Sequence, residues 1–323
     1  MQRQKKILGI LAALTFAALT PASAQDYPNR TIRIIVPFAA GGAVDVVARY
    51  MAEALSKDLK QDSIVENRPG ASGNIGANAV LQSPADGYTF MISASTFVVN
   101  PIVAVEPPRF DPIKDFTQVA LVAKGPLLFV VNPNVADSVQ SFVAKAKADP
   151  SKYNFATGGY GSAGHMSAEA FKIKAGLQIP VILYRGTAPV LADLAGGHVS
   201  GLMDPLLTSL PLAQSGALRA LAISGDKRSP LTPETPTFAE LGIKDFEFYT
   251  WYGLWGPANL PADVMAKVGT ALSNIAKSAD TAKWFAAQGL EFSGATGSAF
   301  VAFERGEQSK YAEIMKSGNI AKH

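Results

Sequence analysis

The sequence predicts an α/β clamshell, in which two doubly wound domains are joined by two crossing strands. Short β-branched runs alternate with helical patterns, which is typical of mostly parallel sheets. The alternation begins a second time after about residue 124. Two long apolar runs, at 119–132 and 246–257, are each long enough to pass from one sheet to the other.

The first 24 residues have the pattern of a secretory signal peptide. Three basic residues within 1–6 precede an apolar run at 7–19, and Ala22-Ser23-Ala24 forms a small-x-small cleavage site before Gln25. The apolar run is shorter than the roughly 20 residues that a bilayer span requires, so an anchoring helix is not expected. We therefore expect an exported protein whose mature chain begins at Gln25.

The composition of the mature chain excludes several classes of protein. Three of the 29 basic residues belong to the signal segment, which leaves 26 against 26 acidic residues. A neutral chain has no electrostatic footprint for nucleic acid or an anionic membrane. The chain has no Cys and 48% hydrophobic residues, so its stability is expected to come from buried cores rather than disulfides.

The first domain is expected to begin with a buried strand at 31–38 and a helix at about 43–59. In this helix, apolar residues recur at helical spacing on one face, and Asp45, Arg49, Glu53 and Lys57 form a ladder of alternating charge on the other. A second strand and glycine loop at 63–73, a helix ending near 82 and a strand at 88–95 follow.

The second domain is expected to repeat this alternation. Gly125-Pro126 breaks the first crossing run, and the remainder from Ala262 on is predicted to be helical. The segments between them are predicted as helices at about 139–148, 165–174 and 188–195, strands at 153–158, 181–186, 199–204 and 218–224, and a Pro-, Ser- and Thr-rich loop at 229–237.

These patterns divide the chain into four segments. They are a signal peptide at 1–24, the first part of domain 1 at 25–124, an inserted domain 2 at 125–247, and a return to domain 1 with C-terminal helices at 248–323. Such clamshells close about their crossings, so we expect a hinge near Gly125-Pro126 and Phe246 to Tyr252.

The loop "GGYGSAG" at 158–164 fits the dinucleotide fingerprint G-x-G-x-x-G. The next strand ends in Tyr184-Arg185-Gly186, with no acidic residue to bind a ribose, although an arginine there suits the 2′-phosphate of NADP. An exported chain reaches a compartment without a nicotinamide pool. The dinucleotide interpretation is therefore disfavoured.

The same loop is one residue away from a hydrolase nucleophile elbow, because Tyr160 occupies a position that needs Gly. The chain has three histidines, and His165 follows Ser162 too closely for a plausible triad. No HExxH motif, Cys or cluster of His with carboxylates indicates a metal site. An exported oxidoreductase or hydrolase remains the alternative function.

Three glycine-containing loops share one physical property. Gly41-Gly42, the segment Gly70 to Gly76 and the segment Gly158 to Gly164 each open a helix, where backbone N–H groups and the positive end of the helix dipole attract anions. A single glycine pair is usually just a turn. Such loops in both halves of a clamshell, at the carboxyl ends of strands, favour one shared anionic ligand.

Several longer motifs occur in order along the mature chain. They include "YPNRTIRIIVPFAAGGAVDVVAR" (27–49), "VENRPGASGNIGA" (65–77), "NFATGGYGSAGHMSAEAF" (154–171), "YRGTAPVLADLAGGHVSGLMD" (184–204) and "WYGLWGP" (251–257). Through these motifs the chain resembles the Bug-type extracytoplasmic solute receptors of tripartite tricarboxylate transporters over essentially its whole mature length. The resemblance implies a type II periplasmic-binding-protein fold, a periplasmic location, no catalysis and no cofactor. It further implies delivery of a small organic acid to a membrane permease.

The resemblance also implies a ligand site, with a carboxylate held on the first-strand loop largely through backbone N–H groups and ordered water. The chain departs from the family in carrying Arg185 where members often have Lys, and in lacking an extra Gly or Pro in the first loop. No metal ligand is expected. The implied positions are Phe38, Gly41, Gly42, Ser93, Ser95, Thr96, Thr157, Gly158, Ser162, His165, Arg185, Gly186 and Asp204.

A dicarboxylate is the expected ligand, because its second charge supplies the differential affinity that closure of two domains requires. Asp204 would repel a dianion unless it pairs with Arg185 or meets an amino or hydroxyl group, and a structural role for it is equally open. Phe97 and Tyr249 at the sides of the site would favour an aromatic diacid, but such aromatics are more often core residues. An aliphatic diacid and a monomeric receptor are therefore expected.

Overall fold

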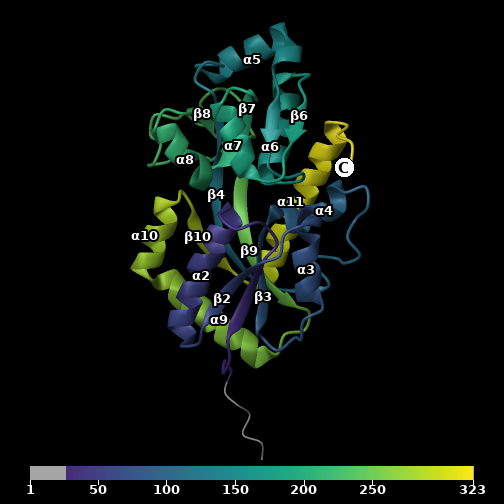
Figure 1. The fold of residues 1–323 in the computed structure, drawn as a ribbon, viewed down its shortest axis with the longest axis vertical. Coiled ribbons are helices and arrows are strands. Elements are labelled where there is room, and N and C mark those ends of the chain that lie inside the picture. The colour runs from purple at the N-terminus through teal and green to yellow at the C-terminus, as the bar shows by residue number, and fades with distance from the viewer. Residues whose placement is uncertain (1–26, 323) are drawn as a thin grey trace, which may run out of the picture.

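The computed structural model of the chain describes residues 27–322, so the expected signal peptide lies outside the described residues. The described residues form two lobes stacked along the long axis of the molecule (Figure 1). The strands are β1 (Ile32–Val36), β2 (Ser63–Asn67), β3 (Thr89–Ala94), β4 (Phe116–Val131), β5 (Phe155–Thr157), β6 (Val181–Leu183), β7 (Gly201–Pro205), β8 (Arg219–Ile223), β9 (Tyr249–Pro257) and β10 (Glu291–Ala295).

The helices cover both faces of the sheet. Lobe 1, the lower lobe in Figure 1, carries α2, α3, α9 and α10, and lobe 2 carries α5 to α8. The helices are α2 (Ala43–Leu59), α3 (Asn74–Leu81), α4 (Ser95–Val103), α5 (Val139–Ala148), α6 (Ala163–Ala175), α7 (Thr187–Ala195), α8 (Leu206–Gln214), α9 (Ala262–Lys277), α10 (Ala279–Ala287) and α11 (Gly297–Ser317), with 3₁₀ turns η1 (Ala71–Gly73) and η2 (Pro150–Lys152).

Strand β4 belongs to both lobes. The strand order is β2-β1-β3-β9-β4-β7-β5-β6, and β8 and β10 also pair with β4. The first part of β4 pairs with β9 and β10 in lobe 1, and its last part pairs with β7 and β8 in lobe 2. The expectation that the run at 119–132 passes from one sheet to the other is therefore confirmed, and Gly125 interrupts neither its pairing nor its course.

The second crossing is shorter than the apolar run that predicted it. Phe246 and Phe248 pack in the core of lobe 2, and the Phe248 N–H donates to the Ser224 carbonyl. The next residue, Tyr249, already pairs with Pro126 of β4 and opens β9, which otherwise pairs within lobe 1. The chain thus passes between the lobes at 246–249.

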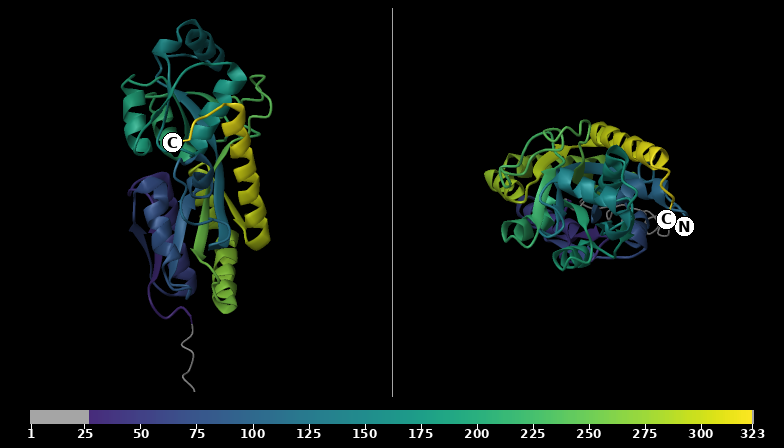
Figure 2. Two further views of the ribbon diagram at one scale, coloured as in Figure 1. Left: turned by 90° about the vertical axis from the view of Figure 1, so that its right-hand side faces the viewer. Right: turned by 90° about the horizontal axis from the view of Figure 1, so that it is seen from above.

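Helix α11 connects the two lobes a third time, alongside the strands (Figure 2). Its Phe300 is buried with the core of lobe 1, whereas Tyr311 and Met315 are buried in the core of lobe 2. The predicted boundaries at residues 124 and 247 treat the C-terminal segment as part of domain 1 alone. That division stays a prediction, and α11 packs against both lobes.

Three elements differ from those expected. The segment that forms β10 was predicted to be helical, which is wrong: Glu291 and Phe292 pair with Lys124 and Ala123 of β4. Helices α4 and α8 were not predicted. Nearly all of α4 is buried, so it lacks the one-sided apolar pattern of a surface helix, and α8 contains Pro211, a residue that ordinarily interrupts a helix.

Among residues 27–322, no helix is both long and apolar enough to cross a bilayer.

Candidate functional site

The carboxyl ends of the parallel strands from both lobes meet at the middle of β4. Strand β3 ends at Ala94 beside Tyr252, whose partner on β4 is Ala123. Strand β7 ends at Pro205 opposite Leu127, four residues further along β4. Strands β1 and β2 run parallel to β3, and β5 and β6 run parallel to β7. The strand ends of both lobes therefore face one region, which we call the junction.

The loop from β1 to α2 brings exposed backbone to the junction. Gly42 caps α2 without a side-chain hydrogen bond, and both it and Gly41 are exposed. Gly41 has a φ of 83°, which glycine adopts without strain. Within residues 27–322, the N–H groups of Ala39 and Ala40 have no hydrogen-bond acceptor, whereas residues 40 and 41 form a turn that directs the Gly42 N–H toward the Ala39 carbonyl. These donors lie at the positive end of α2, which suits an anion.

A buried carboxylate holds this loop in place. Asp45 accepts the Gly41 N–H (2.9 Å), the Arg49 guanidinium (2.9 and 3.0 Å) and the Asn67 amide (2.8 Å). Asn67 also donates to the Phe38 carbonyl at 3.1 Å. Burial raises the pKa of Asp45, but these hydrogen bonds together outweigh it and leave the pKa below its usual value. The Gly41 N–H therefore orders the loop and is not free for a ligand.

Asp45 and Asn67 were missed as site residues for a physical reason. The charge ladder placed Asp45 on the solvent face of the helix, and the predicted ion pairs Asp45–Arg49 and Glu53–Lys57 do form. Asp45 is nevertheless only 3% exposed, because its side chain turns toward the loop that precedes the helix. An acidic residue in the first helical turn after a glycine pair is the signal that could have found it.

The turn from β3 to α4 buries three hydroxyl residues. Ser93, Ser95 and Thr96 are all at least nine-tenths buried, and within the described chain Ser93 Oγ and Thr96 Oγ1 have no hydrogen-bond partner. Ser95 instead lies beside Tyr311 of α11. A buried hydroxyl without a partner costs about 1–3 kcal/mol, so such groups are usually satisfied by water or ligand.

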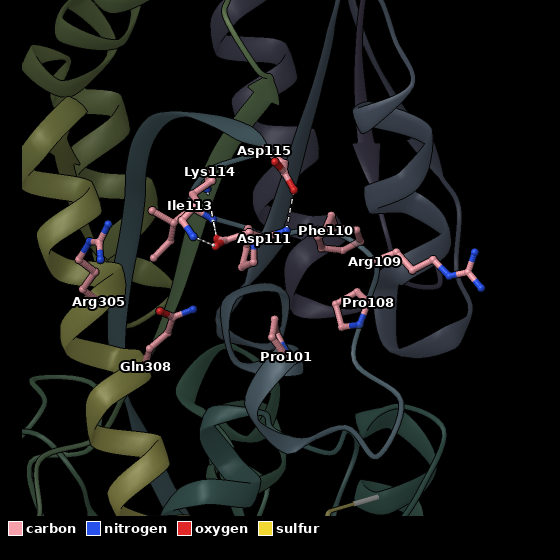
Figure 3. A pocket seen from close by; sticks show the side chains of 11 residues that line it. Pro101, Pro108, Arg109, Phe110, Asp111, Ile113, Lys114, Asp115, Arg305 and Gln308 are labelled. Carbon is pink, nitrogen blue, oxygen red and sulfur yellow. Dashed lines mark hydrogen bonds and ion pairs between the residues drawn. The ribbon is translucent and has the colours of Figure 1, made fainter.

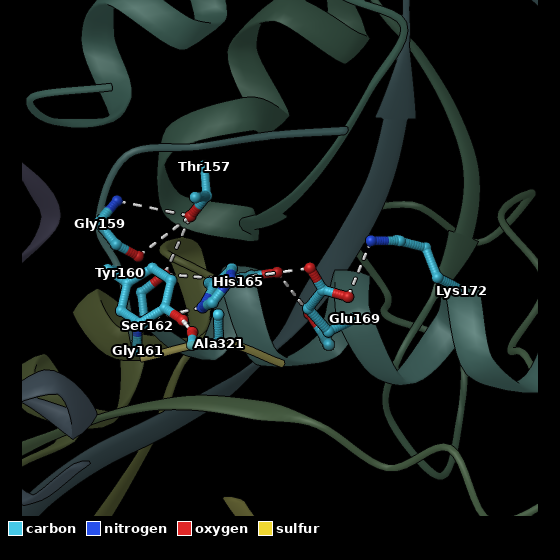
Figure 4. Close-up of polar contacts among 11 residues, drawn as sticks. Thr157, Gly159, Tyr160, Gly161, Ser162, His165, Glu169, Lys172 and Ala321 are labelled. Carbon is cyan, nitrogen blue, oxygen red and sulfur yellow. Dashed lines mark hydrogen bonds and ion pairs between the residues drawn. The ribbon is translucent and has the colours of Figure 1, made fainter. Parts of the chain in front are cut away.

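The loop from β5 to α6 is braced by its own side chains (Figure 4). Ser162 caps α6 by accepting the His165 N–H at 3.1 Å, and its Oγ lies 3.2 Å from Thr157 Oγ1. His165 Nδ1 accepts the Gly161 N–H at 3.1 Å. The side chains of Thr157, Ser162 and His165, which the sequence placed at the ligand, are therefore engaged in fixing the loop.

The ring of Tyr160 extends this network to the end of the chain. It lies against the His165 imidazole with ring centroids 4.4 Å apart, and its hydroxyl donates to the Ala321 carbonyl (Figure 4). On the other side of the imidazole, His165 Nε2 is 4.0 Å from Glu169, which pairs with Lys172 at 2.9 Å.

Gly158 holds the β5–α6 loop against the start of α7. A Cβ at Gly158 would lie 2.5 Å from the Thr187 nitrogen and 2.6 Å from the Gly186 carbonyl carbon, so only glycine fits. Gly186 caps α7 with a φ of 107° and no side-chain hydrogen bond. The N-termini of α6 and α7 are thereby brought together at the junction.

Arg185 carries the cationic charge predicted for lobe 2. It follows the end of β6 and is exposed. Its guanidinium makes no ion pair with any carboxylate in the part of the chain that the structure describes. Arg185 therefore does not pair with Asp204, which was one of the two ways considered for Asp204 to avoid repelling a dianion, and its charge faces no carboxylate of the described chain.

Asp204, the residue before the end of β7, is a fully buried acid. It is 1% exposed, and Thr208 donates to its Oδ2 at 2.6 Å. Burial raises its pKa to about 7, partly offset by the hydroxyls of Thr208 and Ser209. Burial raises the pKa of Tyr252, and the nearby charge of Asp204 raises the Tyr252 pKa further. Asp204 thus carries a proton below about pH 7 and then adds no repulsion to an anion.

The two aromatic residues that were considered as flanks of the ligand have other surroundings. Phe97 is buried in a ring cluster with Phe110, Phe116 and Trp255, so it is a core residue. Tyr249 is half-buried beneath Lys124, whose Nζ is 5.2 Å from the ring centroid. The core position of Phe97 removes the main reason to expect an aromatic ligand.

A pocket of about 440 Å³ lies elsewhere, between the 108–115 loop and α11 (Figure 3). It is lined by Asp111, Lys114, Arg305 and Gln308, among others, and by none of the predicted ligand residues. Across residues 27–322, no group of three or more His, Cys, Asp or Glu side chains is arranged to hold a metal ion.

The fold and the junction define a clamshell solute-binding protein of the periplasmic, type II class. Residues 47–320 match the family described as "Tripartite tricarboxylate transporter family receptor", and the chain belongs to that family. Members of the family are substrate-binding receptors and not enzymes, so the expectation of a receptor is confirmed and the oxidoreductase or hydrolase alternative is set aside.

Three comparisons illustrate the relationship. The chain is 36% identical over 291 residues to protein BugT of Bordetella pertussis, covering 90% of this chain and 89% of BugT. It superposes on the structure of R. palustris Rpa4515 with adipate with a TM-score of 0.88, 32% identity and coverage of 92% and 99%. The structure of MatC from Rhodopseudomonas palustris with bound malate gives a TM-score of 0.81, 26% identity and coverage of 89% and 99%.

Proposed function

We propose that this protein captures an aliphatic dicarboxylate at the junction and delivers it to the membrane permease of a tripartite tricarboxylate-type transporter. The observation that carries the proposal is that the carboxyl ends of the parallel strands from both lobes meet at one point of β4. In open α/β sheets, ligands bind outside such strand ends. A ligand there would touch both lobes at once.

The charges at the junction favour two carboxylates. Lobe 1 supplies the free N–H groups of Ala39 and Ala40, together with the N-terminus of α2. Lobe 2 supplies Arg185 and the N-terminus of α7. A monocarboxylate would use one of these sites and leave the other to water, whereas a dicarboxylate would bridge them and favour the closed arrangement.

The interior of the junction suits the chain between the two carboxylates. The unpartnered hydroxyls of Ser93 and Thr96 would hydrogen-bond polar groups of the ligand or water around it. Asp204, protonated below about pH 7, would sit beside the ligand without repelling it. The relatives solved with adipate and malate each hold an aliphatic dicarboxylate, which supports the same class here.

The proposed ligand site comprises the thirteen positions that the resemblance implies, and they have different roles. Thr157, Ser162 and His165 brace their loop, the Gly41 N–H is held by Asp45, and the other positions offer backbone, hydroxyl or charged groups. We further propose that the signal peptide is cleaved, that the mature protein is periplasmic, and that it acts as a monomer.

Calorimetry tests this proposal directly. Adipate and malate should bind saturably and without turnover, and adipate should bind at least ~100-fold more tightly than its monomethyl ester, a difference of about 2.7 kcal/mol. Equal affinities for the diacid and the monoester would mean that only one lobe binds a carboxylate. The proposal that the ligand bridges the two lobes would then be wrong.

A further inference from the structure

The last described residues of the chain, 318–322, run from the end of α11 back to the β5–α6 loop. We call them the strap. The Tyr160 hydroxyl of the loop donates to the Ala321 carbonyl of the strap, 161 residues further along the chain (Figure 4). Tyr160 is not among the proposed ligand positions. This contact nevertheless ties a loop that faces the junction to the C-terminal helix.

The direction of the strap is set by the way in which α11 ends. Asn319 has a left-handed φ of 48°, and its N–H donates to the Lys316 carbonyl at 3.2 Å. The Ile320 N–H donates to the Met315 carbonyl at 2.9 Å. Together these bonds form a Schellman motif, in which asparagine can take the left-handed position usually held by glycine. The chain therefore turns back at Asn319 instead of continuing along the helix axis.

Apolar packing holds the strap on lobe 2. Ile320 packs against the core of that lobe. Gly318 lies so close to its neighbours that a Cβ there would be 2.9 Å from Ile173 Cδ1 of α6 and 2.9 Å from Ile320 Cγ1. At the other end of α11, Phe300 is buried in the core of lobe 1. The strap thus connects a loop of lobe 2 to a helix that is also fixed in lobe 1.

Within the loop, Tyr160 lies beside the side chain that fixes the shape of the loop. Its ring centroid is 4.4 Å from that of His165, and His165 Nδ1 accepts the Gly161 N–H at 3.1 Å. The Ser162 N–H donates to the Gly159 carbonyl at 3.2 Å. Because the Tyr160 ring is held at its hydroxyl end, it limits the movement of the imidazole and of the loop amides bonded around it.

Resting on the proposed receptor function, we propose that Tyr160 is a positioning residue, through which the strap holds the β5–α6 loop in its ligand-binding conformation. Tyr160 itself contributes no ligand contact. A ligand that meets a preorganised loop does not have to order it, and the saving appears as affinity. Loss of the strap contact should therefore weaken binding without removing any group of the ligand site.

Two pairs of variants test the two sides of this contact. Tyr160→Phe keeps the ring and removes the hydroxyl, and Tyr153→Phe, which removes a hydroxyl from another half-buried tyrosine of lobe 2, is its control. Asn319→Val disfavours the left-handed turn that directs the strap, whereas Asn319→Gly keeps this turn and is the control. Asn319 is exposed, so neither substitution there removes a buried side chain.

Amide hydrogen exchange in the ligand-free protein reports on the loop directly. The Gly161 and Ser162 N–H groups should exchange at least ~10-fold faster in Tyr160→Phe and in Asn319→Val than in the wild type, because local opening becomes easier. In Tyr153→Phe and Asn319→Gly their rates should stay within ~2-fold of the wild type. The amides of β7, in the same lobe, should keep their wild-type rates in all four variants, which distinguishes a loosened loop from a destabilised lobe.

Calorimetry with adipate connects the loop to binding. The affinity should fall about 5-fold, or about 1 kcal/mol, in Tyr160→Phe and in Asn319→Val, and should be unchanged in the two controls. The double variant Tyr160→Phe/Asn319→Val should bind no more weakly than either single variant, because both substitutions break the same contact. Two independent structural effects would instead add, to a loss of about 25-fold.

Wild-type exchange rates at Gly161 and Ser162 in both test variants would overturn the proposal. Additive losses of adipate affinity, an undiminished affinity, or equal effects in the controls would overturn it as well. If the wild-type protein does not bind adipate at all, the proposed receptor function fails separately. Hydrogen exchange then decides alone, since faster exchange in the test variants still supports the strap and unchanged exchange excludes it.

Discussion

The indole Nε1–H of Trp255 donates a 2.7 Å hydrogen bond to Oε1 of Glu304. This bond joins β9 to a fully buried residue of α11. One turn further along the helix, Trp251 makes the same contact with Glu307 at 2.9 Å. The helix that spans both lobes is thus fixed by two indoles to the strand that follows the second crossing. Both tryptophans are completely buried.

The buried Glu304 makes stability depend on pH. Burial raises its pKa to about 8, partly offset by the Trp255 hydrogen bond. The unfolded chain loses this proton near pH 4.5 while the folded chain keeps it to about pH 8, so stability falls as pH rises between these values. Glu304→Gln keeps an acceptor for Trp255 and removes the charge.

Relative to the wild type, Glu304→Gln should therefore gain about 3 kcal/mol in the free energy of unfolding between pH 5.5 and pH 8.5. Urea unfolding at the two pH values measures this difference. The exposed Glu313→Gln on the same helix is the control and should show no such gain. Parallel pH profiles for the wild type and Glu304→Gln would contradict a raised pKa.

Gly42→Val tests the first loop as an anion site. The φ of Gly42 is −80°, and a Cβ there meets nothing nearer than the Ala39 carbonyl at 3.7 Å, so the fold should be kept. The new side chain covers the free N–H groups at the start of α2. Adipate affinity should fall at least ~10-fold, about 1.4 kcal/mol.

Gly269→Val in α9, where a Cβ meets no atom within 4 Å, should leave the adipate affinity unchanged. If Gly42→Val binds adipate with the affinity of the wild type, the β1–α2 loop is only a turn and not an anion site.

Closure of the lobes is expected when a dicarboxylate binds. Bending should concentrate where β4 passes Gly125 and where the chain crosses at 246–249, because fewest strands connect the lobes there. Saturating adipate should reduce the radius of gyration in solution scattering and change the emission of Trp251 and Trp255. Superimposable scattering profiles with and without adipate would rule out closure.

Cleavage before Gln25 follows from the Ala22-Ser23-Ala24 site. The intact mass of the exported protein should correspond to a chain that begins at Gln25. A mass that includes Met1 would contradict the expected processing.

The fold could be predicted where the local pattern and the tertiary environment agree. Helix α2 begins and ends at the expected residues because its apolar face is regular and glycines precede it. Helix α4 escaped prediction because it is buried on nearly every side and carries no polar face. Strand β10 exists through its pairing with β4, an interaction that no local pattern of residues 291–295 encodes.

The candidate site was predictable to a similar extent. Glycine loops before helices located the junction, since such loops mark strand ends in α/β folds. The buried residues next to the site were not predictable from the sequence. The charge pattern of α2 indicated that Asp45 lies on the surface, and Tyr252 belongs to a run that indicated only an apolar crossing. Whether a polar side chain faces a ligand or braces a loop depends on its hydrogen bonds, as His165 illustrates.

The measurement that tests the central claim most directly is the ratio of affinities for adipate and its monomethyl ester in the wild type and in Arg185→Gln. If Arg185 binds the second carboxylate, the ratio should fall from at least ~100 in the wild type to ~10 or less in Arg185→Gln. The affinity of Arg185→Gln for the monoester should stay within ~3-fold of that of the wild type. Arg305→Gln, which removes an arginine beside the other pocket, should keep the full ratio. An undiminished ratio in Arg185→Gln would contradict a ligand bridged between the two lobes.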